Sequence, residues 1–287
     1  MCANLPRMAT RRSQHRPRPD DLAGKHVIDS GTAAIVPASS SGGDWLVVVN
    51  NVVSSSVDLE HPERLDFEYM QWFGAVLDEV APAGAALRVV HIGGAGCTMA
   101  RYVAATRPRS RQHVFEIDGE LVTLARQAFG LRGVQGLRIT AADGREGLAR
   151  LDNDSADVVI RDAFDGEAVP PHLTTVEFMA EVRRVLRPTG TYLANVADTT
   201  DVRHSRIEAS GALALFAHVS LIAEPSQLRK RRFGNVVLAA SGTHLPDNAL
   251  VRRLAGGMVR ARFVDTDAVR TMVAGVRPAH DADLAVS

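Results

Sequence analysis

The stretch that decides the fold is "LRVVHIGGAGCTMARYVAATRPRSRQHVFEID", residues 87–118. It opens with an apolar run over 87–92, passes through a glycine-rich turn into a helical pattern near 97–106, and returns to an apolar run over 113–117. Short apolar runs of this kind predict buried strands, and the segment between them suits one crossover helix. The stretch therefore predicts a βαβ unit, the building block of a parallel sheet.

The alternation of strands and helices continues along the chain. Further strands are expected at 137–141, 157–162, 191–196, 218–224 and 235–241, and helices near 119–129, 145–151, 174–186 and 202–216. Thr174, followed three residues later by Glu177, has the pattern of a capping box at the start of one of these helices. Continuous apolar strands separated by helices indicate a doubly wound α/β sheet that is covered on both faces.

The chain divides into four predicted regions. A disordered Arg/Pro-rich tail is expected over 1–24, a β-hairpin and helix over 25–80, a Rossmann-like domain over 81–245, and a C-terminal helical extension over 246–287. The hairpin is placed at Asn50-Asn51, because asparagine tolerates positive φ and these two residues separate two β-branched runs.

The composition argues against several classes of partner. The 287 residues carry a formal net charge of zero, so no electrostatic argument favours a nucleic acid. Apolar runs fall short of the roughly 18 residues that a membrane span requires, and the N-terminus lacks the apolar core of a signal peptide. The two cysteines show no metal-type spacing. We expect a soluble, cytoplasmic protein with no metal, nucleic-acid or membrane partner.

Ligands of parallel α/β sheets bind at the carboxyl ends of the strands, so the residues that follow each strand form the candidate site. Gly93, Gly94 and Gly96 follow the first strand, where glycines let the backbone approach a ligand closely or simply form a tight turn. Glu116 ends the second strand, 23 residues after Gly93, and can accept both hydroxyl protons of a ribose. Its neighbour Asp118 is expected to cap the following helix.

Acids also follow the third and fourth strands. Asp143, which precedes Gly144 in "AADG", can accept from an adenine amino group or can form an Asp-Gly turn. Asp162 and Asp165 are either turn formers or ligands for a cation. Together these residues indicate an adenosine-containing ligand. The turn Gly-Gly-Ala-Gly-Cys-Thr departs from the G-x-G-x-x-G of NAD enzymes, and the two closing strands favour an S-adenosylmethionine-type sheet.

These segments resemble the spermidine/spermine synthase family of aminopropyltransferases, within the class I S-adenosylmethionine methyltransferase-like fold. The resemblance covers roughly residues 45–241, is strongest to the shorter actinobacterial branch, and is carried by "VVHIGGAGCTMARYV", "FEIDGELVTLAR", "ITAADGREGL", "VVIRDAFDG" and "EFMAEVRRVLRPTGTYLANV". It implies a doubly wound sheet with a small N-terminal β-hairpin and helix. It also implies transfer of an aminopropyl group from decarboxylated S-adenosylmethionine to a small-molecule amine such as putrescine, in a homodimer.

The resemblance further implies a role for each candidate residue. Asp162 would accept the proton of the attacking amine, while Asp165 and Tyr69 would bind the amine substrate. The donor would be held at its ribose by Glu116, at its adenine by Asp143, and at its tail by Gly93 and Gly94, with Gly96 and Gly144 also in the donor site.

Three departures from the family pattern leave the donor and the acceptor open. Gly96 stands where the family has a loop aspartate that meets the donor's ammonium, Ser54 replaces a glutamine, and Phe67-Glu68-Tyr69 replaces a Tyr-His-Glu run. A donor that keeps its carboxylate would meet exposed backbone amides in such a turn. An S-adenosylmethionine-dependent methyltransferase is therefore one alternative, and a non-catalytic nucleoside-binding relative is another.

Overall fold

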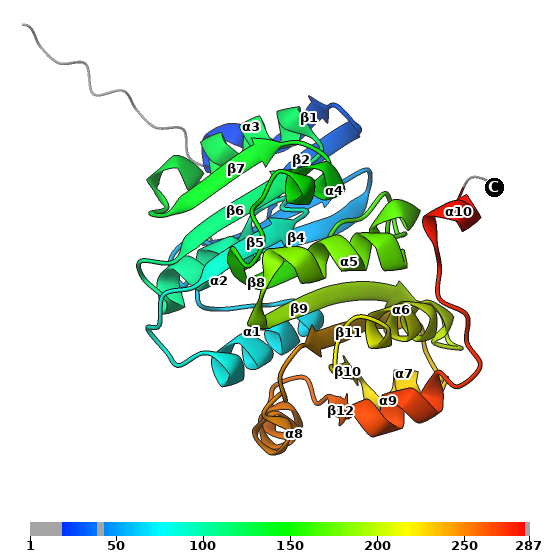
Figure 1. The fold of residues 1–287 in the computed structure, drawn as a ribbon. Helices are drawn as coiled ribbons and strands as arrows, with labels where there is room; N and C mark the ends of the chain where they lie inside the picture. The colour runs from blue at the N-terminus through cyan, green and yellow to red at the C-terminus, as the bar shows by residue number, and fades with distance from the viewer. Residues whose placement is uncertain (1–18, 39–42, 285–287) are drawn as a thin grey trace, which may run out of the picture.

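A mixed sheet of eight strands forms the centre of the protein in the computed structural model, which describes residues 19–38 and 43–284 (Figure 1). The strand order is β12-β10-β11-β9-β8-β5-β6-β7. The strands are β5 (Arg88–Ile92), β6 (Arg111–Glu116), β7 (Leu137–Ala141), β8 (Ala156–Arg161), β9 (Leu186–Asp198), β10 (His218–Ala223), β11 (Gly234–Ser241) and β12 (Arg262–Val264). All seven strands predicted from residue 87 onward are present.

The direction of the strands confirms the predicted doubly wound α/β class. Strands β5 to β9 run parallel, whereas β11 is antiparallel to β9, and β10 is antiparallel to both β11 and β12. From β5 the chain winds outward to β6 and β7 on one side and to β8 and β9 on the other. This reversal places the topological switch point, where ligands of such sheets bind, at the carboxyl end of β5.

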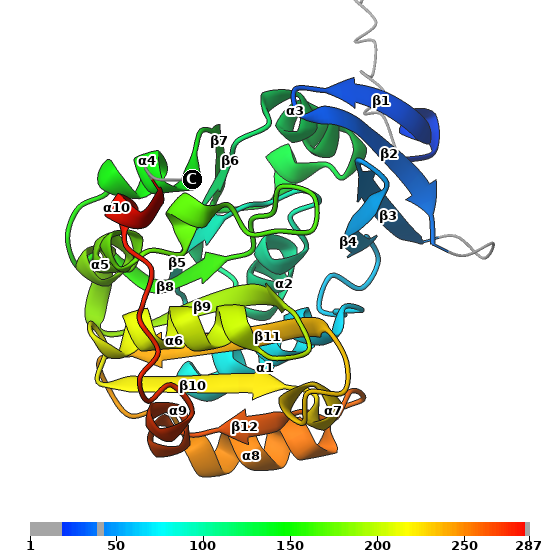
Figure 2. The same cartoon turned by 90° about the vertical axis from the view of Figure 1, so that its right-hand side faces the viewer.

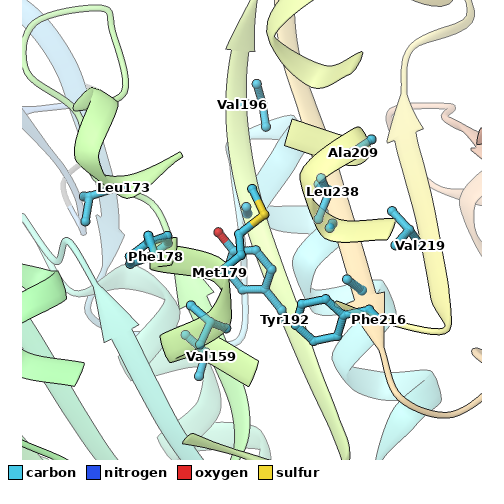
Figure 3. Packing of buried hydrophobic residues seen from close by; sticks show 14 of the residues in the cluster. Val159, Leu173, Phe178, Met179, Tyr192, Val196, Ala209, Phe216, Val219 and Leu238 are labelled. Carbon is cyan, nitrogen blue, oxygen red and sulfur yellow. The ribbon is translucent and has the colours of Figure 1, made fainter. Parts of the chain in front are cut away.

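Helices cover both faces of the sheet. They are α1 (Glu68–Val80), α2 (Thr98–Thr106), α3 (Gly119–Ala128), α4 (Gly144–Ala149), α5 (Val176–Val185), α6 (Arg203–Leu213), α7 (Pro225–Leu228), α8 (Asp247–Gly256), α9 (Thr266–Met272) and α10 (Asp281–Leu284). The core under α4, α5, α6 and α9 includes Tyr192, whose ring stacks on Phe216 with centroids 6.3 Å apart (Figure 3). The core on the opposite face includes side chains of α1, α2 and α8.

A separate antiparallel sheet precedes the central one and stands beside α3 (Figure 2). Its strands are β1 (Gly24–Ile28), β2 (Gly31–Pro37), β3 (Asp44–Val49) and β4 (Val52–Asp58). Asn50 and Asn51 connect β3 to β4 with φ of 49° and 68°, so the predicted hairpin is present. Asp118 caps α3, as predicted, and its Oδ2 also accepts from the Ser30 amide at 2.7 Å, which ties this sheet to the central domain.

The structure corrects the sequence analysis at both ends of the chain. Of the predicted disordered tail, residues 1–18 lie outside the described residues, but Pro19–Leu22 form a 3-10 turn and Gly24 begins β1. The C-terminal extension was expected to be only helical, yet it also supplies β12 at the edge of the central sheet. A strand of three residues has too few positions to show a period of two.

The start of α5 is also corrected. Its N-cap is Thr175, whose hydroxyl accepts from the Phe178 amide at 3.2 Å, and not Thr174. The Thr174 hydroxyl instead donates to the Pro171 carbonyl at 2.8 Å, because a 3-10 turn precedes the helix. Within the described residues, no helix is long and apolar enough to cross a membrane.

Candidate active site

The glycine turn after β5 lies directly against the residue that follows β8. Gly93 has a φ of +83°, and a Cβ added to it would lie 2.2 Å from the Asp162 carbonyl oxygen. A Cβ on Gly94 would lie 2.6 Å from Cγ1 of Val114 on β6. Both positions therefore require glycine, because any side chain would push the turn away from the strand ends that it joins.

The backbone amides of this turn already have acceptors. Oε2 of Glu116 accepts from the amides of Gly94 at 2.8 Å and Ala95 at 3.1 Å, and the Gly96 amide donates to Oγ of Ser55 at 3.0 Å. Three successive donors are thus occupied by side chains that come from β6 and β4. A ligand carboxylate would have to displace these contacts. The methyltransferase alternative assumed that the amides of this turn are exposed, and they are not.

The N-terminal sheet fills the space beside Gly96. A Cβ on Gly96 would lie 2.8 Å from Cγ2 of Val57 and 2.9 Å from Cβ of Ser55, both on β4. An aspartate cannot occupy this position unless β4 moves. The glycine expected at this departure from the family pattern is therefore matched by the packing of β4, where Ser55 was not identified from the sequence.

Asp162 is the carboxylate around which the site is built. Its Oδ2 accepts from the Tyr69 hydroxyl and its Oδ1 from Nδ2 of Asn195, each at 3.0 Å. Burial raises the pKa of Asp162, although these two hydrogen bonds and the nearby Arg161 favour the ionised form. The Tyr69 ring lies edge-on to Phe73, with centroids 5.8 Å apart. Helix α1 and strand β9 therefore fix both oxygens of one partly exposed carboxylate.

A small cavity connects Asp162 to the glycine turn. Its polar lining includes Ser54, Ser55 and His91, and the described residues that line it include no arginine or lysine. Nε2 of His91 bonds Oε1 of Gln112 at 2.9 Å, and burial lowers the pKa of His91 to about 4, so the imidazole is neutral. His91 is a packed core histidine. The cavity thus offers a carboxylate and neutral groups, but no cation.

Asp143 lies at the same edge, at the end of β7. Its Oδ1 caps α4 by accepting from the amides of Arg145 at 2.9 Å and Glu146 at 3.1 Å, and Nε2 of His172 lies 2.8 Å from its Oδ2. Burial opposes ionisation of Asp143, but these hydrogen bonds outweigh it and lower the pKa. A Cβ on Gly144 would meet Cγ2 of Ile92 at 2.2 Å, so Gly144 lets α4 pack on the end of β5.

Asp165 lies apart from the other candidate site residues. It lies on an exposed turn, where its backbone pairs with Ala168 through hydrogen bonds of 2.8 and 3.2 Å. Among the described residues its carboxylate has no hydrogen-bond partner, and it does not line the cavity. Of the two aspartates that follow β8, only Asp162 faces the glycine turn.

Sequence reasoning missed an ion pair directly behind the site. Arg161 is fully buried, and its Nη2 donates to Oε2 of Glu208 at 2.8 Å and to the Asn195 carbonyl at 3.1 Å. The available signal was an arginine at the end of the apolar run "VVIR", where an unpaired charge is costly. Arg161 ends strand β8 and Glu208 lies on helix α6, so no local pattern could have identified Glu208 as the partner.

The close approach of Gly93 to Asp162 gives a first prediction. Gly93→Ala is expected to lower the free energy of unfolding by about 2–3 kcal/mol, because positive-φ strain adds to overpacking against the Asp162 backbone. Gly166→Ala is the matched control, since Gly166 has a φ of +61° and nothing within 4 Å of its Cβ position. The control should cost only about 1 kcal/mol. Urea unfolding measures both variants. Equal losses of unfolding free energy in the two would show that the turn can accommodate a side chain at position 93.

The comparisons with known proteins agree with this geometry. No family model matches the chain. A crystal structure of a probable spermidine synthase from Corynebacterium glutamicum is 36% identical, covers 91% of this chain and 96% of its own, and superposes with a TM-score of 0.84. The chain belongs to the spermidine synthase family. The resemblance inferred from the sequence motifs is confirmed.

Two other relatives define how far the likeness extends. The polyamine aminopropyltransferase of Vibrio vulnificus is 26% identical over 176 residues, which are 61% of this chain and 56% of that protein. The chain thus spans little more than half the length of the curated relatives it matches. The structure of human methyltransferase-like protein 13 in complex with SAH is 20% identical, covers 76% of this chain and 97% of its own, and has a TM-score of 0.52. It shows the fold alone, and the predicted class I methyltransferase-like fold is confirmed.

Proposed function

We propose that this spermidine synthase homologue transfers an aminopropyl group from decarboxylated S-adenosylmethionine to a small-molecule amine. The observation that carries the proposal is the Asp162 carboxylate, which Tyr69 and Asn195 hold beside the glycine turn, in a cavity whose described lining residues include no cationic side chain. The relatives agree with it, since one is a polyamine aminopropyltransferase and another a probable spermidine synthase.

The donor would lie across the carboxyl ends of β5, β6 and β7. Glu116 would accept from the ribose hydroxyls with the lone pairs that the amides of the turn leave free, and Asp143 would accept from the adenine amino group. The turn from Gly93 to Gly96 would pass under the donor's sulfonium tail. Gly144 would keep α4 close enough to β5 to close the adenine end of the site.

The reaction needs one proton acceptor and good alignment. An alkylammonium has a pKa near 10 in water and is not nucleophilic until it loses a proton. Asp162 would take this proton, after which the amine nitrogen attacks the methylene next to sulfur. A nitrogen–carbon bond forms, the carbon–sulfur bond breaks, and the sulfonium leaves as a neutral thioether nucleoside. Placing the two reactants in line supplies much of the remaining acceleration.

The charge of the site favours a donor that has lost its carboxylate. Glu116 and Asp162 are both acidic, the amides of the turn are occupied, and the described cavity lining includes no arginine or lysine. A carboxylate placed here would face like charges without a partner. An aminopropyl tail, which ends in an ammonium, meets complementary charge instead.

Calorimetry with the two donors tests this choice. We expect decarboxylated S-adenosylmethionine to bind at least about tenfold more tightly than S-adenosylmethionine, which corresponds to about 1.4 kcal/mol. The contact that discriminates is electrostatic, so the difference should shrink as salt is added. Tighter binding of the carboxylated donor would instead support the methyltransferase alternative. Failure to bind either donor would argue against the whole assignment, including a nucleoside-binding relative.

The assembly and location of the protein are proposed from the family resemblance. We propose that the chain works as a homodimer in the cytoplasm, with a small-molecule amine as its second substrate. Among the described residues, no three His, Cys, Asp or Glu side chains gather as they would around a metal ion. The proposed reaction uses only a side-chain carboxylate and the donor's own sulfonium.

A further inference from the structure

The C-terminal segment, residues 277–284, is attached to the adenine end of the proposed donor site. Its short helix α10 lies beside α4 and α5 (Figure 2). The Ala279 carbonyl accepts from the Val176 amide at 3.0 Å, and the Asp281 amide donates to Oε2 of Glu177 at 3.0 Å. These contacts fix the segment to the first turn of α5, directly after the loop that follows β8.

Asp281 links this segment to α4. Its Oδ1 and Oδ2 accept from Nη1 and Nη2 of Arg145 at 2.8 and 2.5 Å, the bidentate geometry in which a carboxylate orients a guanidinium most specifically. Oδ1 also accepts from the Thr175 hydroxyl at 2.8 Å. The hydrogen bonds between the two side chains lower the pKa of Asp281 and raise the pKa of Arg145, so both stay charged. Asp281 therefore fixes the direction of the Arg145 side chain.

Arg145 in turn acts on both oxygens of Asp143. Its backbone amide donates to Oδ1 of Asp143 at 2.9 Å, and its Nη1 donates to the His172 carbonyl at 3.4 Å. Nε2 of His172 lies 2.8 Å from Oδ2 of Asp143, and it is the donor because the lowered pKa of Asp143 keeps this carboxylate ionised. The three residues thus form a closed ring of hydrogen bonds, which Asp281 braces from outside.

This ring determines which acceptor position Asp143 has left for a ligand. A carboxylate has about four lone-pair directions. Among the described residues, the amides of Arg145 and Glu146 and the ring nitrogen of His172 take three of them, so one remains for an adenine amino group. Its direction depends on Arg145 and His172, because these groups orient the carboxylate. Hydrogen bonds weaken steeply as they bend, so a shift of either group would weaken the contact to adenine.

We propose that Asp281 is a positioning residue for the donor's adenine and acts through Arg145 on the free acceptor of Asp143. The inference rests on the proposed function, because it assumes that the adenine lies at Asp143. It gives the C-terminal segment a part in donor recognition, 136 residues along the chain from Arg145. Asp162 is held by other partners, so the chemical step should not depend on Asp281.

Calorimetry with two nucleosides tests the assignment without turnover. 5′-Methylthioadenosine carries the amino group, whereas 5′-methylthioinosine has a carbonyl oxygen there and cannot donate to Asp143. Wild-type protein should bind the adenosine form at least about tenfold more tightly, the usual value of a hydrogen bond to a charged group. Asp281→Ala should reduce this preference to about threefold or less. Partial unfolding would weaken both nucleosides equally and leave the preference unchanged, so the ratio reports positioning and not stability.

Asp283→Ala is the matched control. Asp283 lies on the same helix, but its partners, Nη2 of Arg277 and the His280 amide, belong to the C-terminal segment itself. This variant should keep the full preference. If Asp281 acts through Arg145, the double variant Arg145→Ala/Asp281→Ala should have the same preference as Arg145→Ala alone.

The outcomes separate this inference from the proposed reaction. An unchanged preference in Asp281→Ala, an equal loss in Asp283→Ala, or additive losses in the double variant would overturn the inference while aminopropyl transfer stands. Equal binding of both nucleosides by wild-type protein, or no binding, would overturn it together with the adenine role of Asp143. The expected loss in Asp281→Ala would support it even if the transfer reaction fails.

Discussion

Replacing Asp162 with Asn is expected to reduce kcat for aminopropyl transfer by about 10²- to 10⁴-fold, the usual contribution of a positioned general base. The amide keeps the size of the carboxylate, and its oxygen can still accept from one of the two donors, Tyr69 or Asn195, so the fold and the donor site should persist. Single-turnover kinetics, together with calorimetry of the donor, measure the two effects separately. Full activity in Asp162→Asn would mean that another group takes the proton.

The pH dependence of the same site provides a finer check. Burial raises the pKa of Asp162, and the carboxylate must be ionised to accept a proton, so kcat/KM should fall as the pH decreases through this raised pKa. The Tyr69 hydroxyl stabilises the ionised form. Tyr69→Phe should therefore raise the pKa further and shift the acidic limb of the profile to higher pH. If the acidic limb of the kcat/KM profile does not shift in Tyr69→Phe, the group that titrates in this limb is not Asp162.

The second large effect concerns the ion pair behind the site. Glu208→Gln is expected to lower the free energy of unfolding by about 3–5 kcal/mol, because it leaves the charge of a fully buried Arg161 uncompensated. Nε and Nη1 of Arg161 already lack hydrogen-bond partners among the described residues, and Glu208 is the one carboxylate there with which the guanidinium forms an ion pair. Urea unfolding measures the loss.

A double replacement distinguishes the charge from the packing. Arg161→Met combined with Glu208→Leu removes both charges and keeps similar volume, so it should be clearly more stable than Glu208→Gln alone. Its activity should nevertheless fall, because Nη2 of Arg161 also bonds the Asn195 carbonyl, and Asn195 orients Asp162. A double variant as unstable as the single one would show that shape, and not charge, is what this pair contributes.

The parts of the structure that could be predicted from sequence are those with local signals. The order of strands and helices from residue 87 follows from apolar runs and crossovers, and the β3–β4 turn follows from Asn50 and Asn51, which tolerate positive φ. The strand-end positions of Glu116, Asp143 and Asp162 follow from topology alone. Strand β12 has three residues and therefore no readable period.

Other features depend on contacts between distant segments. Whether Asp162 or Asp165 faces the glycine turn is decided by the path of the loop after β8, and both aspartates look alike in the sequence. The Gly96 amide meets Ser55 from 41 residues away, and Ser55 also occupies the space that a Cβ on Gly96 would need. The pairing of Arg161 with Glu208 spans 47 residues. Such contacts leave neither a hydrophobic periodicity nor a helix-capping pattern in the local sequence.

The central claim is aminopropyl transfer at Asp162, and mass spectrometry of one reaction mixture tests it most directly. The protein is incubated with decarboxylated S-adenosylmethionine and putrescine, and parallel mixtures contain S-adenosylmethionine or the Asp162→Asn variant. We predict one equivalent of 5′-methylthioadenosine for each aminopropylated putrescine, in the first mixture only. Methylated amine with S-adenosylhomocysteine in the second mixture, or no product in any mixture, would contradict the account.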